Sequence, residues 1–195
     1  MRIKLYYLFF GLCFTLINGC TQQIPKEKAY PRVYFPKKSY KNFKSECNYS
    51  FDIPTYCHVE NKEYFRNERL KSDSCWVNIV FGNFNGKLHV SYKFFENQDS
   101  LTKLMEQHYK LTTKHIVKAT YIKDSIIDKP NLKGLIYSVG GNAASDMQFL
   151  LTDTKHKFLR GALYFNNTPN IDSMRPVIQF VNKDIMHLIE TFKFE

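Results

Sequence analysis

The chain has 195 residues and a formal net charge of +10 at neutral pH, and this charge is unevenly placed. Residues 20–45 carry seven basic side chains against Glu27 alone, whereas residues 46–195 carry 19 basic and 17 acidic side chains. The length fits one folded domain with an appendage. The high isoelectric point therefore belongs to the N-terminal part and is not a property of the folded part.

Residues 1–19 have the composition of a bacterial lipoprotein signal peptide. Arg2 and Lys4 precede an apolar stretch, residues 5–17, that is too short to cross a bilayer as a mature helix. The sequence Leu-Ile-Asn-Gly then leads to Cys20, which we expect to be lipidated and to become the new N-terminus. The alternative is an ordinary secretory signal that is cut elsewhere. An exported, acylated chain does not meet DNA, which excludes nucleic-acid binding.

The segment after this cysteine, residues 20–45, is predicted to be a lipidated basic tether. It is rich in lysine and poor in aliphatic residues, and it contains Pro25, Pro31 and Pro36, a composition typical of an extended linker. Its positive charge favours contact with anionic lipid head groups. Tyr30 and Arg32 lie in its aromatic part, which we expect to dock on the domain or on a partner.

Three cysteines remain in the predicted domain, Cys47, Cys57 and Cys75, so at most one intramolecular disulfide can form. An exported protein meets conditions that permit disulfides. Cys47 and Cys75 each begin a predicted strand, which favours a bond between them, and a bond between Cys57 and Cys75 is the alternative. A reactive thiol, or a metal site with His58, lacks the spacing of a known zinc motif.

The spacing of apolar residues predicts the strands and the helix of the first half of the domain. Alternating or continuous apolar residues predict strands at residues 49–53, 75–81 and 88–94, with a charged surface loop at residues 63–73. A helix is expected at residues 97–119, with Asp99 or Ser100 as its cap and one apolar face. His108 and His115 lie on that face. Their spacing of seven does not suit a metal pair, so we interpret both as buried packing residues.

The second half is predicted to return to strands and then to end in a helix. Strands are expected at residues 120–127, 134–139, 147–151 and 158–165, and a strongly amphipathic helix at residues 171–192, capped by Asp172 or Ser173. The hairpin at residues 140–165 is so apolar that helices should cover at least one face of its sheet. The sequence therefore predicts a single α+β domain over residues 46–195, with a largely antiparallel sheet of about six strands packed against two amphipathic helices.

The sequence contains no recognisable catalytic, cofactor or metal motif. There is no His-Glu-x-x-His, no Gly-x-Ser-x-Gly and no paired-cysteine redox motif. The glycine-rich residues 140–145 lead into a strand and lack the lysine of a phosphate loop, so a wide turn or bulge is expected there. Arg160 is the one charge inside the central strand. We expect it to extend towards solvent, to pair with Asp146 or Asp153, or to contact a partner.

Several blocks of the chain together resemble a known family. They are Cys20, Tyr30-Pro31-Arg32, residues 47–56, Cys75-Trp76 with Asn78-Ile79, Leu88-His89 with Ser91-Tyr92, residues 140–145, Gln148-Phe149, residues 151–153, residues 158–165 and residues 185–192. They resemble the gliding motility lipoprotein GldD family of Bacteroidota over nearly the whole chain. The order of elements is also similar to the Mog1/PsbP-like fold, by pattern alone.

The resemblance implies a cell-envelope lipoprotein that is needed for gliding and is tied to the type IX secretion machinery, with no enzymatic activity and no cofactor. We therefore expect a non-enzymatic adaptor, anchored by its lipid in the outer membrane, that contacts other gliding and secretion proteins through Tyr30, Arg32 and Arg160. The alternative is a module that binds a small ligand in a cleft between helix and sheet, near Trp76, Tyr92 and Arg160. A hydrolase would need a polar constellation that the sequence does not supply.

Overall fold

The central hairpin determines how the fold is layered. The computed structural model describes residues 33–61, 75–114, 116–168 and 170–195, and residues 33–195 form one compact unit. Strands β8 (Met147–Thr152) and β9 (Lys157–Phe165) are buried on both faces. Leu151 and Leu159 join one hydrophobic cluster, whereas Leu150 and Phe158 join another. Because neighbouring residues of a strand point to opposite faces, each face needs its own cover.

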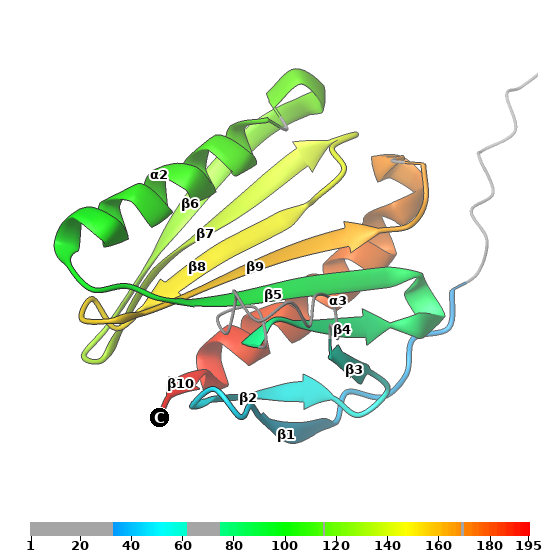
Figure 1. Ribbon diagram of the computed structural model, residues 1–195. Helices are drawn as coiled ribbons and strands as arrows, with labels where there is room; N and C mark the ends of the chain where they lie inside the picture. Colours follow the sequence, from blue (N-terminus) through cyan, green and yellow to red (C-terminus); the bar gives the residue numbers. More distant parts are fainter. Residues whose placement is uncertain (1–32, 62–74, 115, 169) are drawn as a thin grey trace, which may run out of the picture. The chain divides into compact units, whose positions relative to one another are not determined.

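The hairpin lies near the middle of a seven-stranded antiparallel sheet (Figure 1). The strands occur in the order β3 (His58–Asn61), β4 (Val77–Phe81), β5 (Gly86–Phe94), β9, β8, β7 (Leu132–Gly141) and β6 (Ala119–Lys129). The prediction of an α+β fold with an antiparallel sheet is confirmed. The described residues contain more strands than the expected six, and the likeness to the Mog1/PsbP-like fold stays a prediction.

A second, three-stranded sheet accounts for most of the strands that were not predicted. It has the order β1 (Tyr40–Lys44), β2 (Tyr49–Pro54) and β10 (Lys193–Phe194), and both outer strands are antiparallel to β2. β1 falls within the residues expected to form an extended linker, so that prediction is wrong for this stretch. Its lysine-rich sequence suits the edge of the small sheet, because Lys41 and Lys44 stay exposed there.

Helix α3 (Ile171–Thr191) packs on one face of the large sheet, beside the small sheet. Its buried residues recur at three- and four-residue steps, as predicted: Val177, Ile178, Val181, Asp184, Ile185, Leu188 and Ile189. The cap is Asn170, whose side chain accepts from the Ser173 backbone N–H, and not Asp172 or Ser173. Pro176 lies beyond the first turn.

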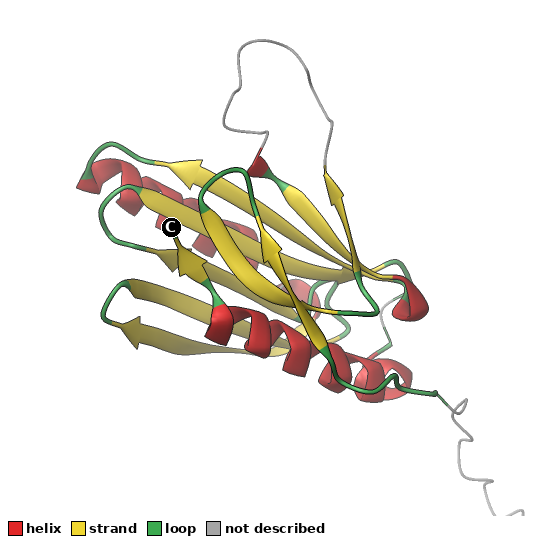
Figure 2. Cartoon of the chain, turned by 90° about the horizontal axis from the view of Figure 1, so that it is seen from below, coloured by secondary structure: helices red, strands yellow, loops and turns green. Residues whose placement is uncertain are grey.

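Helix α2 (Gln98–Thr113) covers part of the opposite face. Figures 1 and 2 show the strands of the large sheet lying between the two helices. Asn97, and not Asp99 or Ser100, caps α2, since its side chain accepts from the Ser100 N–H. The helix is shorter than predicted, and a 3-10 turn, η3 (Ile116–Lys118), leads from it towards β6. α2 packs over β7, β8 and β9, which leaves the β3–β5 half of this face without a helix.

At two positions the surrounding structure requires a glycine. A Cβ on Gly161 would lie 2.2 Å from the ring of Phe149, its partner across β8 and β9, so only glycine lets this ring lie flat on the sheet. Gly141 has a φ of +92° at the end of β7, opposite a register shift in β6 between Ala119 and Tyr121. The expected turn or bulge in residues 140–145 therefore agrees with the structure.

Candidate functional site

Arg160 lies under α2, where it forms a polar layer with two neutral side chains. Its Nε donates to His108 Nδ1 at 3.0 Å, and its Nη2 donates to Gln148 Oε1 at 2.9 Å. Thr112 Oγ1, also on α2, lies 3.3 Å from the same Gln148 oxygen. Because Arg160 donates to Nδ1, the imidazole is neutral and carries its proton on Nε2. Burial and the nearby guanidinium lower the pKa of His108 to about 4.

The carboxylates expected to pair with Arg160 have other roles. Asp153 accepts backbone N–H groups from Lys155, His156 and Lys157 in the β8–β9 turn, which lowers its pKa although burial opposes the shift. Asp146 is buried beside β8, and burial raises its pKa to about 6. No described carboxylate forms an ion pair with Arg160. Its hydrogen bonds therefore join α2 to the sheet.

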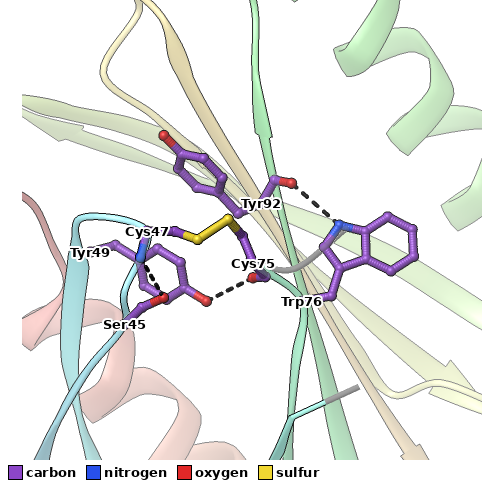
Figure 3. The surroundings of a disulfide bond; sticks show 6 residues. All are labelled: Ser45, Cys47, Tyr49, Cys75, Trp76 and Tyr92. Carbon is purple, nitrogen blue, oxygen red and sulfur yellow. Dashed lines mark hydrogen bonds between the residues drawn. A yellow bond between two sulfur atoms is a disulfide. The ribbon is translucent and has the colours of Figure 1, made fainter. Parts of the chain in front are cut away.

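Cys47 and Cys75 form a disulfide that links the small sheet to the large one (Figure 3). The hydroxyl of the fully buried Tyr49 donates to the carbonyl of Cys75 at 2.9 Å. Trp76 Nε1 donates to the carbonyl of Tyr92 at 3.3 Å, and the Tyr92 ring stacks on that of Tyr49. Hydrogen bonds and rings thus surround the cross-link.

Cys57 is the remaining free cysteine of the described chain, and it is buried. Burial and the nearby Asp184 raise the pKa of its thiol to about 12, so it is protonated at neutral pH and is a poor nucleophile. The described residues contain no cluster of histidine, cysteine and acidic side chains that could hold a metal ion. His115 lies outside the described residues.

A buried carboxylate on α3 binds the N-terminal segment, a feature that the sequence did not predict. Asp184 accepts from Lys38 at 2.6 Å, from the Tyr40 hydroxyl at 2.9 Å and from the Tyr56 hydroxyl through a short hydrogen bond. The carboxylate itself is fully buried, whereas the Lys38 side chain is 29% exposed. Burial and the carboxylate raise the pKa of Tyr40 to about 12 and also raise that of Tyr56. We call Lys38, Tyr40, Tyr56 and Asp184 the Asp184 cluster.

Aromatic contacts extend this attachment towards the N-terminus. Lys38 also donates to the Phe180 carbonyl, and its ammonium lies 3.6 Å from the centre of the Phe180 ring. The Phe35 ring lies 4.6 Å from the same ring. One signal in the sequence could have revealed the cluster: Asp184 is the single acid on the apolar stripe of α3. The chain is therefore fastened to α3 ahead of β1, before the predicted end of the tether.

The predicted ligand cleft near Trp76, Tyr92 and Arg160 does not coincide with either of two hollows on the described surface. A hollow of about 460 Å³ lies instead over the ends of β4, β5 and β9, where Lys87, His89 and Tyr164 are among its lining residues. A much smaller hollow, of about 20 Å³, lies between the β7–β8 connection and the start of α3. Trp76, Tyr92 and Arg160 line neither of them.

The other predicted site residues, Cys20, Tyr30 and Arg32, lie outside the described residues. Among the residues that are described, no helix is both long enough and apolar enough to cross a membrane.

A comparison with protein families matches residues 20–194 to the model of the gliding motility lipoprotein GldD family. The chain belongs to the GldD family. The match begins at Cys20, the predicted lipidation site, and includes both sheets and both helices. Membership makes the chain a gliding motility lipoprotein and implies that it is anchored to a membrane. No curated protein matches the chain.

Proposed function

We propose that this GldD-family chain is an adaptor, held by lipid on Cys20 at the outer membrane, that binds and stabilises other gliding and type IX secretion proteins without catalysing a reaction. The observation that carries the proposal is the family match, which begins at the cysteine that follows a signal-like segment. Acyl chains on one cysteine anchor a protein stably when there are two or more of them.

The attachment of the N-terminal segment also supports an adaptor. The Asp184 cluster holds the chain ahead of β1 on α3, so the anchored end leaves the domain at a defined place. Three titratable groups with strongly shifted pKa values are engaged in packing: Tyr56 donates to Asp184, His108 contacts Arg160, and Cys57 is a buried protonated thiol.

The test is an in-cell crosslinking and co-isolation experiment on the full chain with an affinity tag after Glu195. We expect other gliding and secretion proteins to be recovered after gentle extraction, and labelled palmitate to be incorporated. A Cys20→Ser chain should lose the label, leave the membrane fraction and fail to support gliding. Recovery of the chain alone, from cells that glide normally, would contradict the adaptor function.

A small-ligand module is the second candidate, favoured by the hollow over β4, β5 and β9. Its volume of about 460 Å³ is within the range of ligand pockets, and polar side chains line it beside the Tyr164 ring. Native mass spectrometry of the chain purified from envelopes checks this candidate. A reproducible small molecule that is lost in a Lys87→Ala/Tyr164→Ala chain would favour ligand binding over an adaptor.

A further inference from the structure

The outer edge of β6 is the longest free strand edge of the described residues. β6 has 11 residues, about 36 Å at roughly 3.3 Å per residue, and pairs on one side only, with β7. The strand at the other edge of the large sheet, β3, has four residues, and the outer strands of the small sheet have five and two. Half of the backbone N–H and C=O groups along β6 therefore point away from the sheet.

This edge has some of the features by which proteins protect a free strand and lacks others. Short strands, prolines, bulges and charged side chains commonly block pairing with other chains, and β6 carries Lys123, Asp124, Asp128 and Lys129. β6 contains no proline, its one register shift is at its start, and all but three of its side chains are exposed. Tyr121 is 52% exposed and Ile126 is 76% exposed. An edge of this length, with exposed apolar side chains between its charges, is suited to pairing with a strand whose charges complement its own.

The two faces of β6 differ in how far they are already covered. On the α3 side, Ile127 is buried in the core, the Tyr121 ring lies on Gly140, and the Lys123 ammonium lies 5.3 Å from the centre of the Tyr121 ring. On the α2 side, Ile122, Asp124 and Ile126 follow one another at every second residue of the strand, so an acidic side chain lies between two apolar ones. Recognition of side chains is therefore expected on the α2 side.

The α2 side combines apolar surface with one negative charge that has no ion pair among the described residues. Asp124 lies opposite Tyr137 of β7, and Tyr109 of α2 is close enough to Tyr137 to affect its pKa. Tyr109 is 58% exposed. Asp124 has no ion-pair partner among the described residues, whereas Asp128 pairs with Lys133. We call Tyr109, Ile122, Asp124, Ile126 and Tyr137 the β6 edge surface.

We propose that β6 receives an extended segment of another envelope protein, in which a basic residue is flanked at two-residue spacing by apolar residues. The segment adds an eighth strand next to β6. Residues that lie opposite one another in an antiparallel pair share a face, so the basic side chain meets Asp124 and the apolar ones meet Ile122 and Ile126. The inference rests on the proposed adaptor function, because it names the chemistry of one partner.

Like charges oppose a second copy of the chain in three registers of this edge, whereas a register centred on Ser125 avoids them, so a dimer is an outcome of the test below. In a twofold antiparallel pair of β6 strands, a register centred on Asp124 or on Lys123 brings like charges together. A register centred on Ile126 places Asp124 opposite Asp128 and Lys123 opposite Lys129. Like charges directly opposite one another weaken strand pairing.

The experiment uses the full lipidated chain in nanodiscs and two short synthetic peptides as probes. In one peptide every second residue is threonine, and the residues between the threonines are valine, lysine and valine in that order. The other peptide has glutamate in place of the lysine. We expect the lysine peptide to bind at least about threefold more tightly, in fluorescence anisotropy at low salt, since each cross-strand pair changes affinity several-fold at most. Hydrogen exchange should slow in the amides of residues 119–129 when it binds.

Charge reversal gives the matched comparison. Asp124→Lys should invert the preference between the two peptides, Asp124→Asn should abolish it, and Glu106→Lys, an equal change on the exposed side of α2, should leave it unchanged. The inference is overturned if neither peptide protects β6, or if Asp124→Lys keeps the preference for lysine. It is also overturned if sedimentation shows that the chain dimerises in the absence of peptide and the amides of β6 are protected in this dimer.

The two proposals fail in different ways. If the Asp124→Lys chain still co-isolates its partners from cells while the peptides do not bind β6, the adaptor function stands and this edge is not its contact. If no partner co-isolates with the unaltered chain, the adaptor function itself fails.

Discussion

The Lys38 ammonium lies 2.6 Å from the carboxylate of Asp184, and this pair joins the segment ahead of β1 to the middle of α3. A carboxylate that is buried without compensation is strongly destabilising. In this chain one cation and two tyrosine hydroxyls compensate it. The pair therefore contributes to the attachment of α3 and fastens the segment ahead of β1 to the domain.

Replacement of Lys38 by methionine should lower the free energy of unfolding by about 2 kcal/mol. Removal of one partner of a buried pair costs more than this, but Lys38 is partly exposed and solvent screens its charge. Urea denaturation followed by the fluorescence of Trp76, the single tryptophan, measures the change. Lys37→Met, at the exposed neighbouring residue, should stay within about 0.5 kcal/mol. Equal effects of the two substitutions would contradict the role of the pair.

Loss of the disulfide should destabilise the chain by about 3–4 kcal/mol, since the bond closes a loop with a sequence separation of 28. Cys47→Ser and added reductant should lower the midpoint of thermal unfolding by the same amount. Reductant should have no further effect on the Cys47→Ser chain. A non-reduced digest should yield Cys47 linked to Cys75, and a Cys57–Cys75 link would refute the assignment.

The pH dependence of stability should show two opposing contributions of about 3 kcal/mol each. Burial lowers the pKa of His108 from 6.5 to about 4. The contribution of His108 to the free energy of unfolding is therefore present above pH 6.5 and is lost as the pH falls towards 4. Burial raises the pKa of Asp146 from 3.8 to about 6, so its contribution is present below pH 3.8 and is lost as the pH rises through 6.

Two single variants separate these contributions in denaturation curves recorded at several pH values. Relative to the unaltered chain, Asp146→Asn should gain stability as the pH rises from 4 to 6, because the falling contribution of Asp146 is removed. His108→Leu should lose stability over the same range, because the rising contribution of His108 is removed. Parallel pH profiles for all three chains would show that neither group has a shifted pKa.

Substitution of Arg160 by lysine should cost about 1–3 kcal/mol, because one ammonium cannot replace the planar guanidinium that donates to both His108 and Gln148. Arg175→Lys, at an exposed arginine of α3, is the control and should have little effect. In cells, any loss of gliding in the Arg160→Lys strain should be proportional to the decrease in the abundance of the protein. Lost gliding at normal abundance would instead support a direct contact between Arg160 and a partner.

Alanine at residue 161 should destabilise the sheet by about 2 kcal/mol, because its Cβ would clash with the Phe149 ring in a strand that is buried on both faces. Gly82→Ala is the matched control, since a Cβ there meets nothing within 4 Å. Thermal unfolding of the two variants checks the difference. An equally stable Gly161→Ala chain would mean that the Phe149 ring can move aside at little cost.

Local patterns predicted the elements whose packing follows from their own residues. The apolar runs of β8 and β9 and the stripe of α3 identify their buried faces within one segment of sequence. The helix caps were assigned to neighbours of the true ones, because Asn97 and Asn170 are each followed by other residues that can cap.

Features that depend on distant partners could not be predicted in this way. β1 and β10 become strands only through their pairing with β2, and neither has a pattern of its own. The partners of Arg160 come from α2 and β8, so no local rule pairs them. Asp184 on the apolar stripe of α3 is a signal of a buried charge. That Lys38 is its partner depends on the path of the segment ahead of β1, whose composition is typical of a linker.

The position of the disulfide also has a mechanical consequence. Tension applied at Val33 would load the Phe35–Phe180 contact, then the Lys38–Asp184 pair and then the hydrogen bonds between β1 and β2. If these yield, the chain lengthens only as far as Cys47, where a covalent bond transfers the force to Cys75 at the start of β4. Force applied on the membrane side of this protein is thus transferred to the seven-stranded sheet after about a dozen residues have been extended, at roughly 3.5 Å each.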